Sequence, residues 1–249
     1  MWFPDPTRLF SVLTLSIMSF RHAQATGDVM STLMGLYFNP YVLAFLSAAL
    51  LVVYASSPQR VSSNKKAHLR LPKYDQWAAE WYWWNAWLYH ATMDGAAGSL
   101  RLVPVVVHQY DILDLRFPTH DVVPWLVGLI ELLVMHPLCL ACLYCIRTRH
   151  PLRFPLELVT STLHIMGMVL FVGAEVYQGQ VHIPAMDPVG RIDDEGNRTI
   201  SLQFNLYHIT YYWFGFWFCN LVWGYVPLIR IARALRECRL ALELSTKDE

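Results

Sequence analysis

Long apolar stretches separated by shorter polar segments dominate the sequence. A helix needs about 20 residues to cross the hydrocarbon core of a bilayer. Five stretches come close to that length or exceed it, and they cover roughly residues 30–54, 77–95, 122–146, 155–176 and 206–232. The pattern predicts an all-α integral membrane protein, in which five transmembrane helices form one bundle around an intramembrane cavity.

The second stretch is the least apolar of the five and the richest in tryptophan. It contains Trp77, Trp81, Trp83, Trp84 and Trp87, together with Glu80, Asn85, His90 and Asp94. Polar groups at membrane depth are costly unless they face protein partners or a water-filled cavity. We therefore expect this helix to face the interior, with Trp84 and Trp87 among the residues that line the cavity.

The composition and the placement of charge narrow the class of protein further. Apolar residues make up 55% of the 249 positions, and 19 basic residues balance 19 acidic ones, which argues against disorder and against nucleic-acid binding. Thirteen of the basic residues lie at or beyond the C-terminal ends of the first, third and fifth stretches: Arg60, Lys65, Lys66, Arg70, Lys73, Arg147, Arg149, Arg153, Arg230, Arg233, Arg236, Arg239 and Lys247. Because basic residues accumulate in cytoplasmic loops, the N-terminus is predicted to be lumenal and the C-terminus cytosolic.

The N-terminal segment leaves two interpretations open. A short apolar run, 9–20, precedes Ala23-Gln24-Ala25, which is similar to the cleavage site of a signal peptide. The alternative is an interfacial helix on the lumenal leaflet. The expected organisation is a lumenal segment over 1–28, a membrane domain over 29–234 and a cytosolic tail over 235–249, with an Asn197 glycosylation triplet in a lumenal loop.

His90 and Asp94 are the first candidates for chemistry. A spacing of four residues places both side chains on one face of a helix, so the carboxylate could orient the imidazole and make it a proton donor. The alternative is a structural hydrogen bond between helices. Glu131 adds a second carboxyl group within an apolar stretch, where it must be protonated or paired across the bundle.

Further polar residues occur in the last two stretches. His164 is compatible with a functional site or with a structural position in the core. Asn220 must find hydrogen-bond partners and lies three residues before Trp223, on the same side of a helix. An indole ring there would stabilise a cation in a cavity. Cys139, Cys142 and Cys145 are better explained by packing than by metal binding, so no metal is predicted. The absence of a phosphate loop or nucleotide fingerprint predicts no cofactor.

Four blocks in this order resemble the emopamil-binding protein family, the sterol Δ8-Δ7 isomerases of the EXPERA superfamily. The blocks are His90-Ala91-Thr92-Met93-Asp94-Gly95; Tyr110, Asp114, Arg116 and Asp121; Arg149-His150-Pro151-Leu152-Arg153-Phe154; and Asn220-Leu221-Val222-Trp223 with Pro227. The resemblance extends from about residue 77 to residue 234.

The resemblance implies a five-helix bundle in the endoplasmic reticulum membrane with a sterol-sized cavity, and it is compatible with a homodimer. In the family, a histidine and two acidic residues move protons through a carbocation. This implies catalytic roles for His90, Asp94, Glu131, Asn220 and Trp223, with Trp223 facing the cation and Asn220 holding the acid site. The expected substrate-binding residues are Trp84, Trp87, Tyr110, Arg116, Asp121, His164, Met168, Trp213 and Trp217.

The sequence also departs from the family. Asp94 stands where the family has Glu, and the family's second Glu falls on Gly128. Glu131 lies three residues later, which displaces a carboxyl group by about 4.5 Å along a helix. Met168 occupies the position of a family acid.

Three functions are compatible with these residues. The first is a sterol or terpenoid double-bond isomerase. The second is a proton-initiated cyclase or rearrangement enzyme acting on another lipophilic metabolite. The third is a non-catalytic sterol- or lipid-binding protein, since a fold does not fix a function.

Overall fold

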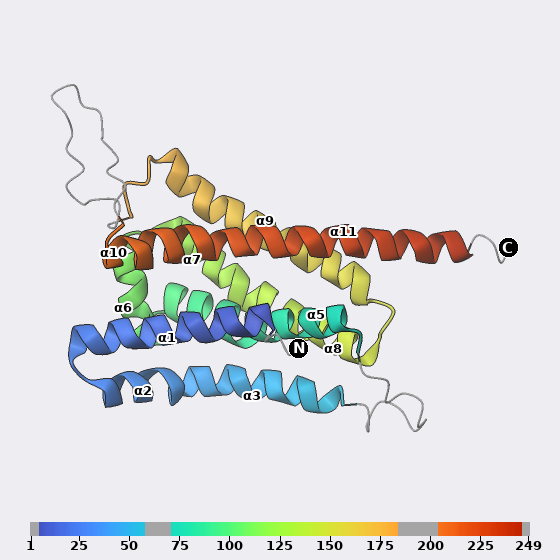
Figure 1. Cartoon of the computed structure of the whole chain (residues 1–249), viewed down its shortest axis with the longest axis horizontal. Coiled ribbons are helices and arrows are strands. Elements are labelled where there is room, and N and C mark those ends of the chain that lie inside the picture. The colour runs from blue at the N-terminus through green and yellow to red at the C-terminus, as the bar shows by residue number, and fades with distance from the viewer. Residues whose placement is uncertain (1–4, 58–70, 184–203, 246–249) are drawn as a thin grey trace.

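The computed structural model describes residues 5–57, 71–183 and 204–245, and these residues form helices without any strand. Figure 1 shows most of the helices lying side by side along one direction. The elements are α1 (Pro6–Thr26), α2 (Val29–Tyr37), α3 (Pro40–Ala55), α5 (Lys73–Trp84), η2 (Asn85–Ser99), α6 (Pro104–Leu113), α7 (Val122–Ile130), η3 (Glu131–Met135), α8 (His136–Thr148), α9 (Arg153–Tyr177), α10 (Leu206–His208), η5 (Ile209–Phe218) and α11 (Cys219–Ser245). The expected all-helical class is confirmed for this part of the chain.

Three helices are long and apolar enough to cross a membrane: Val122–Thr148, Arg153–Tyr177 and Leu206–Ser245. The count rises to four if α2 and α3, which meet at an angle of 45°, form one span. The stretch expected at 77–95 is helical, but its acidic and amide side chains lower its hydropathy below that of a typical span. The described residues therefore support three to four candidate spans rather than the five that the pattern predicted.

The helix formed by α5 and η2 lies at the centre of the bundle. Every residue of η2 except Asp94 is buried, and η2 contacts α3, α6, α7, η3 and α8. A helix surrounded by protein can hold polar side chains that would be costly against lipid. Asn85–Ser99 also has π-helical hydrogen bonding, as do η3 and η5, and such widened turns occur frequently at functional sites.

Helix α1 packs against this centre. The Asp5 carboxylate caps its N-terminus, and it ends at Gly27, whose φ of 69° is favourable for glycine. Ser11, Thr14 and Met18 face inward, and the Tyr89 hydroxyl donates a hydrogen bond of 3.1 Å to Ser11. The run at 9–20 is thus a helix packed on α5 and α6 in the described structure. Whether this segment is cleaved stays a prediction.

One end of the bundle gathers basic side chains. The turn between α8 and α9, the start of α5 and the distal half of α11 lie toward the same side in Figure 1. Asp75 joins them, because its carboxylate pairs with Arg153 at 2.7 Å and with Arg233 at 2.8 Å. The glycosylation triplet at Asn197 and several of the expected cytosolic residues, namely Arg60, Lys65, Lys66, Arg70 and Lys247, lie outside the described residues.

Candidate active site

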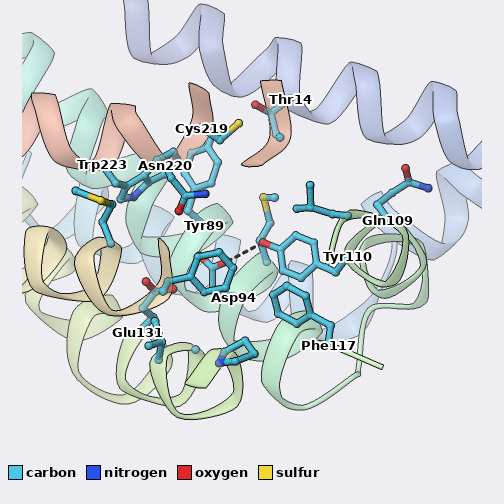
Figure 2. A pocket seen from close by; sticks show the side chains of 18 of the residues that line it. Thr14, Tyr89, Asp94, Gln109, Tyr110, Phe117, Glu131, Cys219, Asn220 and Trp223 are labelled. Atoms are coloured by element: carbon cyan, nitrogen blue, oxygen red, sulfur yellow. Dashed lines mark hydrogen bonds between the residues drawn. The ribbon is translucent and has the colours of Figure 1, made fainter. Parts of the chain in front are cut away.

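A pocket lies between α1, η2, α6, α7, α9 and the helix formed by η5 and α11. Its cavity volume, measured as the space open to the centre of a water-sized sphere, is about 170 Å³, and most of its wall is apolar. Figure 2 shows Asp94 and Glu131 on one side, Asn220 and Trp223 above them, and Thr14 of α1 over the top. Pockets for small ligands combine an apolar wall with a few convergent polar groups, and this one has that composition.

Two carboxyl groups at the wall of this pocket lie close to one buried imidazole. One ligand-type atom from each of His90, Asp94 and Glu131 lies within 4.8 Å of the others. The His90 Nδ1 atom is 3.7 Å from Glu131 Oε2, and Asp94 accepts a hydrogen bond of 2.6 Å from the Tyr110 hydroxyl. Two adjacent carboxyl groups in an apolar site cannot both carry a charge cheaply, so the pair is suited to holding a proton.

The backbone explains why the second carboxyl group stands at Glu131. Gly128 lies so close to Asp94 and Ser99 that a Cβ atom would clash with the Asp94 carbonyl oxygen and with the Ser99 hydroxyl. No acidic side chain fits there. Opposite Glu131, Gly167 leaves room, since a Cβ built on it would stand 3.8 Å from Glu131 Oε1. The structure thus accommodates the Glu131 carboxyl group about one helical turn beyond Gly128, where the resemblance placed the family's second Glu.

The imidazole of His90 is held differently from the sequence-based expectation. Its hydrogen-bond partner is His164 rather than Asp94, with 2.8 Å between the two Nε2 atoms. His164 Nδ1 lies 2.9 Å from the Thr160 carbonyl oxygen. His90 is 1% exposed and is absent from the pocket wall, whereas His164 lines it. A contact between the two imidazoles therefore joins η2 to α9 at this site.

An aromatic wall surrounds the Trp223 ring. Tyr89 meets it edge-on with 4.6 Å between ring centroids, and Phe10 and Trp81 each lie 5.7 Å away. The indole N–H of Trp223 donates to Asn85 Oδ1 at 2.9 Å, while Asn220 donates to the Phe216 carbonyl. The ring is thereby fixed at the pocket, where its face can stabilise a cation.

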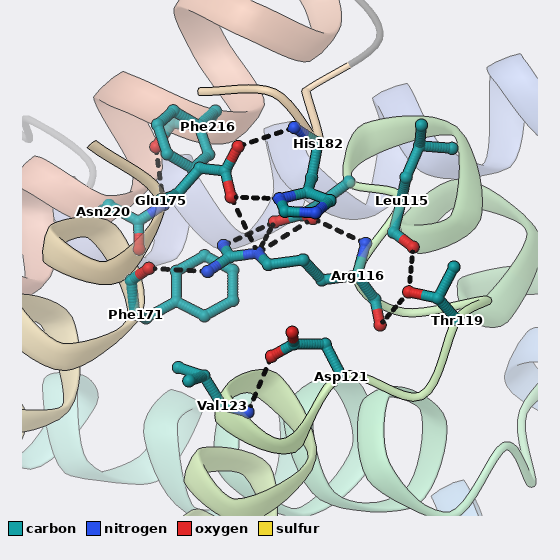
Figure 3. A network of polar contacts seen from close by, with 11 residues as sticks. Leu115, Arg116, Thr119, Asp121, Val123, Phe171, Glu175, His182, Phe216 and Asn220 are labelled. Atoms are coloured by element: carbon teal, nitrogen blue, oxygen red, sulfur yellow. Dashed lines mark hydrogen bonds and ion pairs between the residues drawn. The ribbon is translucent and has the colours of Figure 1, made fainter. Parts of the chain in front are cut away.

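Two of the expected binding residues, Arg116 and Asp121, have structural contacts outside the pocket wall. Arg116, 1% exposed, pairs with Asp114 at 2.6 Å and with Glu175 at 3.3 Å, and donates to the Phe171 carbonyl (Figure 3). Asp121 caps α7 by accepting from the backbone N–H of Val123. We call Asp114, Arg116, Glu175 and His182 the arginine cluster. Neither Arg116 nor Asp121 is part of the pocket wall.

The four tryptophans that were expected to bind substrate also pack outside the pocket. Trp84 and Trp87 pack on each other at 5.4 Å, and Trp84 faces a second hollow between α1, α3, α5 and α8. Trp213 stacks on Phe204, and Trp217 meets Phe216 edge-on. The pocket wall includes none of these four tryptophans, whereas Tyr110, His164 and Met168 are part of it, as expected.

Several pocket residues had no counterpart among the sequence-based candidates. They are Thr14 and Met18 of α1, Tyr89, Gln109, Phe117 and Cys219. Asn85, which holds Trp223, was visible as a polar residue in an apolar helix and could have been found by that signal. The contribution of α1 depends on packing between segments far apart in the chain, which no local pattern reveals.

A metal ion is a weaker explanation of this cluster than a hydrogen bond. His90, Cys139 and His164 approach one another within 4.8 Å, as do His90, Asp94 and Glu131. Two imidazole nitrogens bound to one tetrahedral zinc ion would be about 3.3 Å apart, given Zn–N bonds near 2.05 Å. The 2.8 Å between His90 and His164 is instead a hydrogen-bond distance.

Comparison with known proteins supplies the family. A family model described as EXPERA, the expanded EBP superfamily, matches residues 103–234, which is more than half of the chain. The matched region includes Glu131, His164 and Trp223 and begins after Asp94. No curated protein matches the sequence. Because the match covers more than half of the chain, the chain belongs to the EXPERA superfamily, a family of sterol-related membrane proteins.

Proposed function

We propose that the protein is an intramembrane isomerase, which shifts a carbon-carbon double bond in a sterol or a related polycyclic terpenoid. The observation that carries the proposal is the convergence of Asp94, Glu131 and His90 beside an apolar pocket that also holds the Trp223 ring. An apolar chamber selects a lipophilic substrate. Two carboxyl groups with one shared proton can both give and accept a proton.

The proposed reaction needs only one proton in and one proton out. A carboxyl group of the pair protonates one carbon of the double bond, and the neighbouring carbon becomes a carbocation. The faces of Trp223 and Tyr89 stabilise that positive charge while water is excluded. Loss of a proton from an adjacent carbon to a carboxylate then forms the shifted double bond. Asp94 and Glu131 are the groups that touch substrate, Asn85 holds the Trp223 indole, and Asn220 lines the pocket from the same helix as Trp223.

This proposal includes a membrane arrangement. We infer five spans: α2 with α3, the stretch 77–95 within α5 and η2, α7 with α8, α9, and η5 with α11. The second span is surrounded by the other helices, so its polar side chains do not face lipid and a low hydropathy is tolerated there. The basic end would face the cytosol, including the C-terminal tail, and the end that carries α6 and α10 would face the lumen of the endoplasmic reticulum.

A cyclase or rearrangement enzyme is the second candidate. The observation in its favour is the position of Glu131, because Gly128 excludes the family's arrangement and the acid is displaced along the helix. A displaced acid would protonate a different carbon, and small displacements of reacting groups are costly for an unsuited substrate. A non-catalytic sterol- or lipid-binding protein is the remaining alternative.

The decisive experiment follows deuterium. Membranes containing the protein are incubated in D₂O with a Δ8-sterol, and the product is analysed by mass spectrometry for a shifted double bond and one deuterium. Glu131→Gln should stop the shift, whereas Glu80→Gln, which alters a carboxylate paired with Arg8 outside the pocket, serves as the control. Unlabelled, unshifted sterol would exclude this substrate.

The lipid that copurifies with the protein separates the alternatives. A cyclised or rearranged compound carrying solvent deuterium would support the cyclase. A lipid that is released unchanged, with no labelled product from any polycyclic alkene tested, would support the binding protein.

A further inference from the structure

The two buried histidines form a chain with a defined direction. His164 Nδ1 faces the Thr160 carbonyl oxygen at 2.9 Å, and a carbonyl oxygen can only accept a hydrogen bond. The proton of a neutral His164 is therefore on Nδ1, and its Nε2 atom carries a lone pair. Since His90 Nε2 lies 2.8 Å from that lone pair, His90 must donate from Nε2.

This assignment leaves one nitrogen of His90 without a partner. Its Nδ1 atom is fully buried, makes no hydrogen bond within the described residues, and lies 3.7 Å from Glu131 Oε2. The reverse assignment would require a cationic His164, and its hydrogen-bond partners are only a carbonyl group and a second imidazole. A buried cation without a hydrogen-bonded carboxylate is costly.

We propose that His164 is a positioning residue that holds His90 as the Nε2–H tautomer, so that His90 exchanges a proton with Glu131 rather than with substrate. The inference rests on the proposed isomerase function. A proton moves from the Glu131 carboxyl group to His90 Nδ1, which gives an imidazolium and a carboxylate, and the same proton returns when the carboxyl group is needed. The O–H bonding pair stays on the carboxylate oxygen and the Nδ1 lone pair forms the new N–H bond, so no oxidant, reductant or other reactant is required.

The position of His90 supports this indirect role. Asp94 and Glu131 line the pocket, while His90 lies behind them and is absent from its wall. The imidazole then adjusts the charge of the carboxyl pair, so that one carboxyl group is an acid at the start of a turnover and a base at its end. His164 acts only through His90.

Nitrogen NMR tests the tautomers without any need for turnover. In protein labelled with ¹⁵N-histidine, the His90→Ala and His164→Leu variants assign the two signals among the ten histidines. We expect a neutral Nδ1–H form for His164 and an Nε2–H form for His90. The same tautomer at both residues, or the shift of a metal-bound imidazole, would overturn the proposal even in an active enzyme.

Activity measurements then test whether His164 acts through His90. His164→Leu should lower kcat at least about tenfold with little change in KM, by analogy with other residues that fix a histidine tautomer. His164→Gln should restore most of the rate, because its amide oxygen can accept from His90 Nε2. In the His90→Ala background, His164→Leu should have no additional effect.

Three results would contradict this role. One is an additional loss in the double variant, and another is an equal loss in the Gln and Leu variants. The third is a similar loss in His22→Leu, which removes an imidazole outside the pocket wall. If wild-type protein shows no isomerase activity but the NMR tautomers are as assigned, the proposed function fails and the histidine arrangement stands.

Discussion

The acid cluster of His90, Asp94, Glu131 and His164 and the arginine cluster of Asp114, Arg116, Glu175 and His182 are both largely buried, His182 being the most exposed member, but their charges are arranged differently. In the arginine cluster, one guanidinium group stands between two carboxylates, and His182 donates to Glu175 through its backbone N–H at 2.8 Å. In the acid cluster, two carboxyl groups adjoin each other, and the Nδ1 atom of His90 has no hydrogen bond.

This difference indicates which cluster stabilises the fold and which one can react. Complementary charges with satisfied hydrogen bonds fix a loop and have no reason to exchange protons. Two neighbouring carboxyl groups beside an imidazole nitrogen that has no hydrogen bond can exchange a proton at a small cost in free energy. Only the acid cluster borders the pocket with both of its carboxyl groups.

Removing charge from the acid cluster should give the largest effect. Asp94→Asn and Glu131→Gln keep the shape of the side chains but prevent proton transfer, so the rate should fall by about 10²- to 10⁴-fold while folding is preserved. Deuterium incorporation per minute measures the change. The control is Asp111→Asn, which alters a carboxylate paired with the partly exposed Arg101. This variant should incorporate deuterium at the wild-type rate. An unchanged rate in Glu131→Gln would make that residue structural.

The arginine cluster should show the opposite behaviour. Arg116→Met leaves the buried Asp114 without its ion-pair partner and leaves Glu175 with His182 alone, which should destabilise the protein by about 3–5 kcal/mol. Denaturant unfolding in micelles measures the loss. Arg101→Met removes a more exposed ion pair and should cost at most about 1 kcal/mol. A stable Arg116→Met protein with low activity per folded molecule would place Arg116 in the reaction instead.

The aromatic wall should contribute less than the acids. Trp223→Leu removes the indole face beside the pocket, and a desolvated cation–π contact of about 2 kcal/mol corresponds to a roughly 30-fold lower rate. Trp223→Phe should lose less, because a ring remains. Trp213→Leu changes a tryptophan that stacks on Phe204 outside the pocket wall and should leave the rate unaltered. Equal losses in all three variants would indicate a general packing effect.

The smallest effect concerns pH at the basic end of the bundle, where Asp75 precedes the apolar stretch that begins near residue 77. Burial alone would raise the pKa of Asp75, but hydrogen bonds and charges from Arg153 and Arg233 outweigh it and hold the pKa below its usual value. The stabilisation is therefore complete above the unfolded pKa and is lost as pH falls through the lower folded pKa.

The free energies of unfolding of wild type and Asp75→Asn, obtained from thermal melts, should thus differ by a constant amount from about pH 5 to about pH 8. An aspartate in an unfolded chain has a pKa of about 4 and is charged throughout this range. The two proteins should converge in stronger acid. A difference that already shrinks within the neutral range would contradict the depressed pKa of Asp75.

The sequence predicted the helical class and most of the acid cluster. Apolar stretches specify helices in a membrane because backbone groups there must bond within their own segment. His90, Asp94 and Glu131 stood out because a titratable group in an apolar stretch requires an explanation wherever it points. The resemblance to the family was confirmed by the match over residues 103–234.

The tertiary structure decided which polar and aromatic residues meet. Arg116 and Asp121 have the same residue types as site residues, but their partners turn them into structural groups. Trp84 and Trp87 share a helix with His90, yet they face away from the pocket. Thr14 and His164 come to the pocket from α1 and α9, and the spacing of residues along one helix contains no information about such neighbours.

By itself, then, the order of apolar and polar residues determined a helical membrane protein with titratable groups in its interior. Such a pattern determines which segments leave water, because the free energy of transferring side chains from water to an apolar environment depends on the residues of each segment alone. The contact between His90 and His164, the position of Glu131 opposite Gly167 and the wall supplied by α1 arose only from packing. They depend on distances between segments that are remote in the chain.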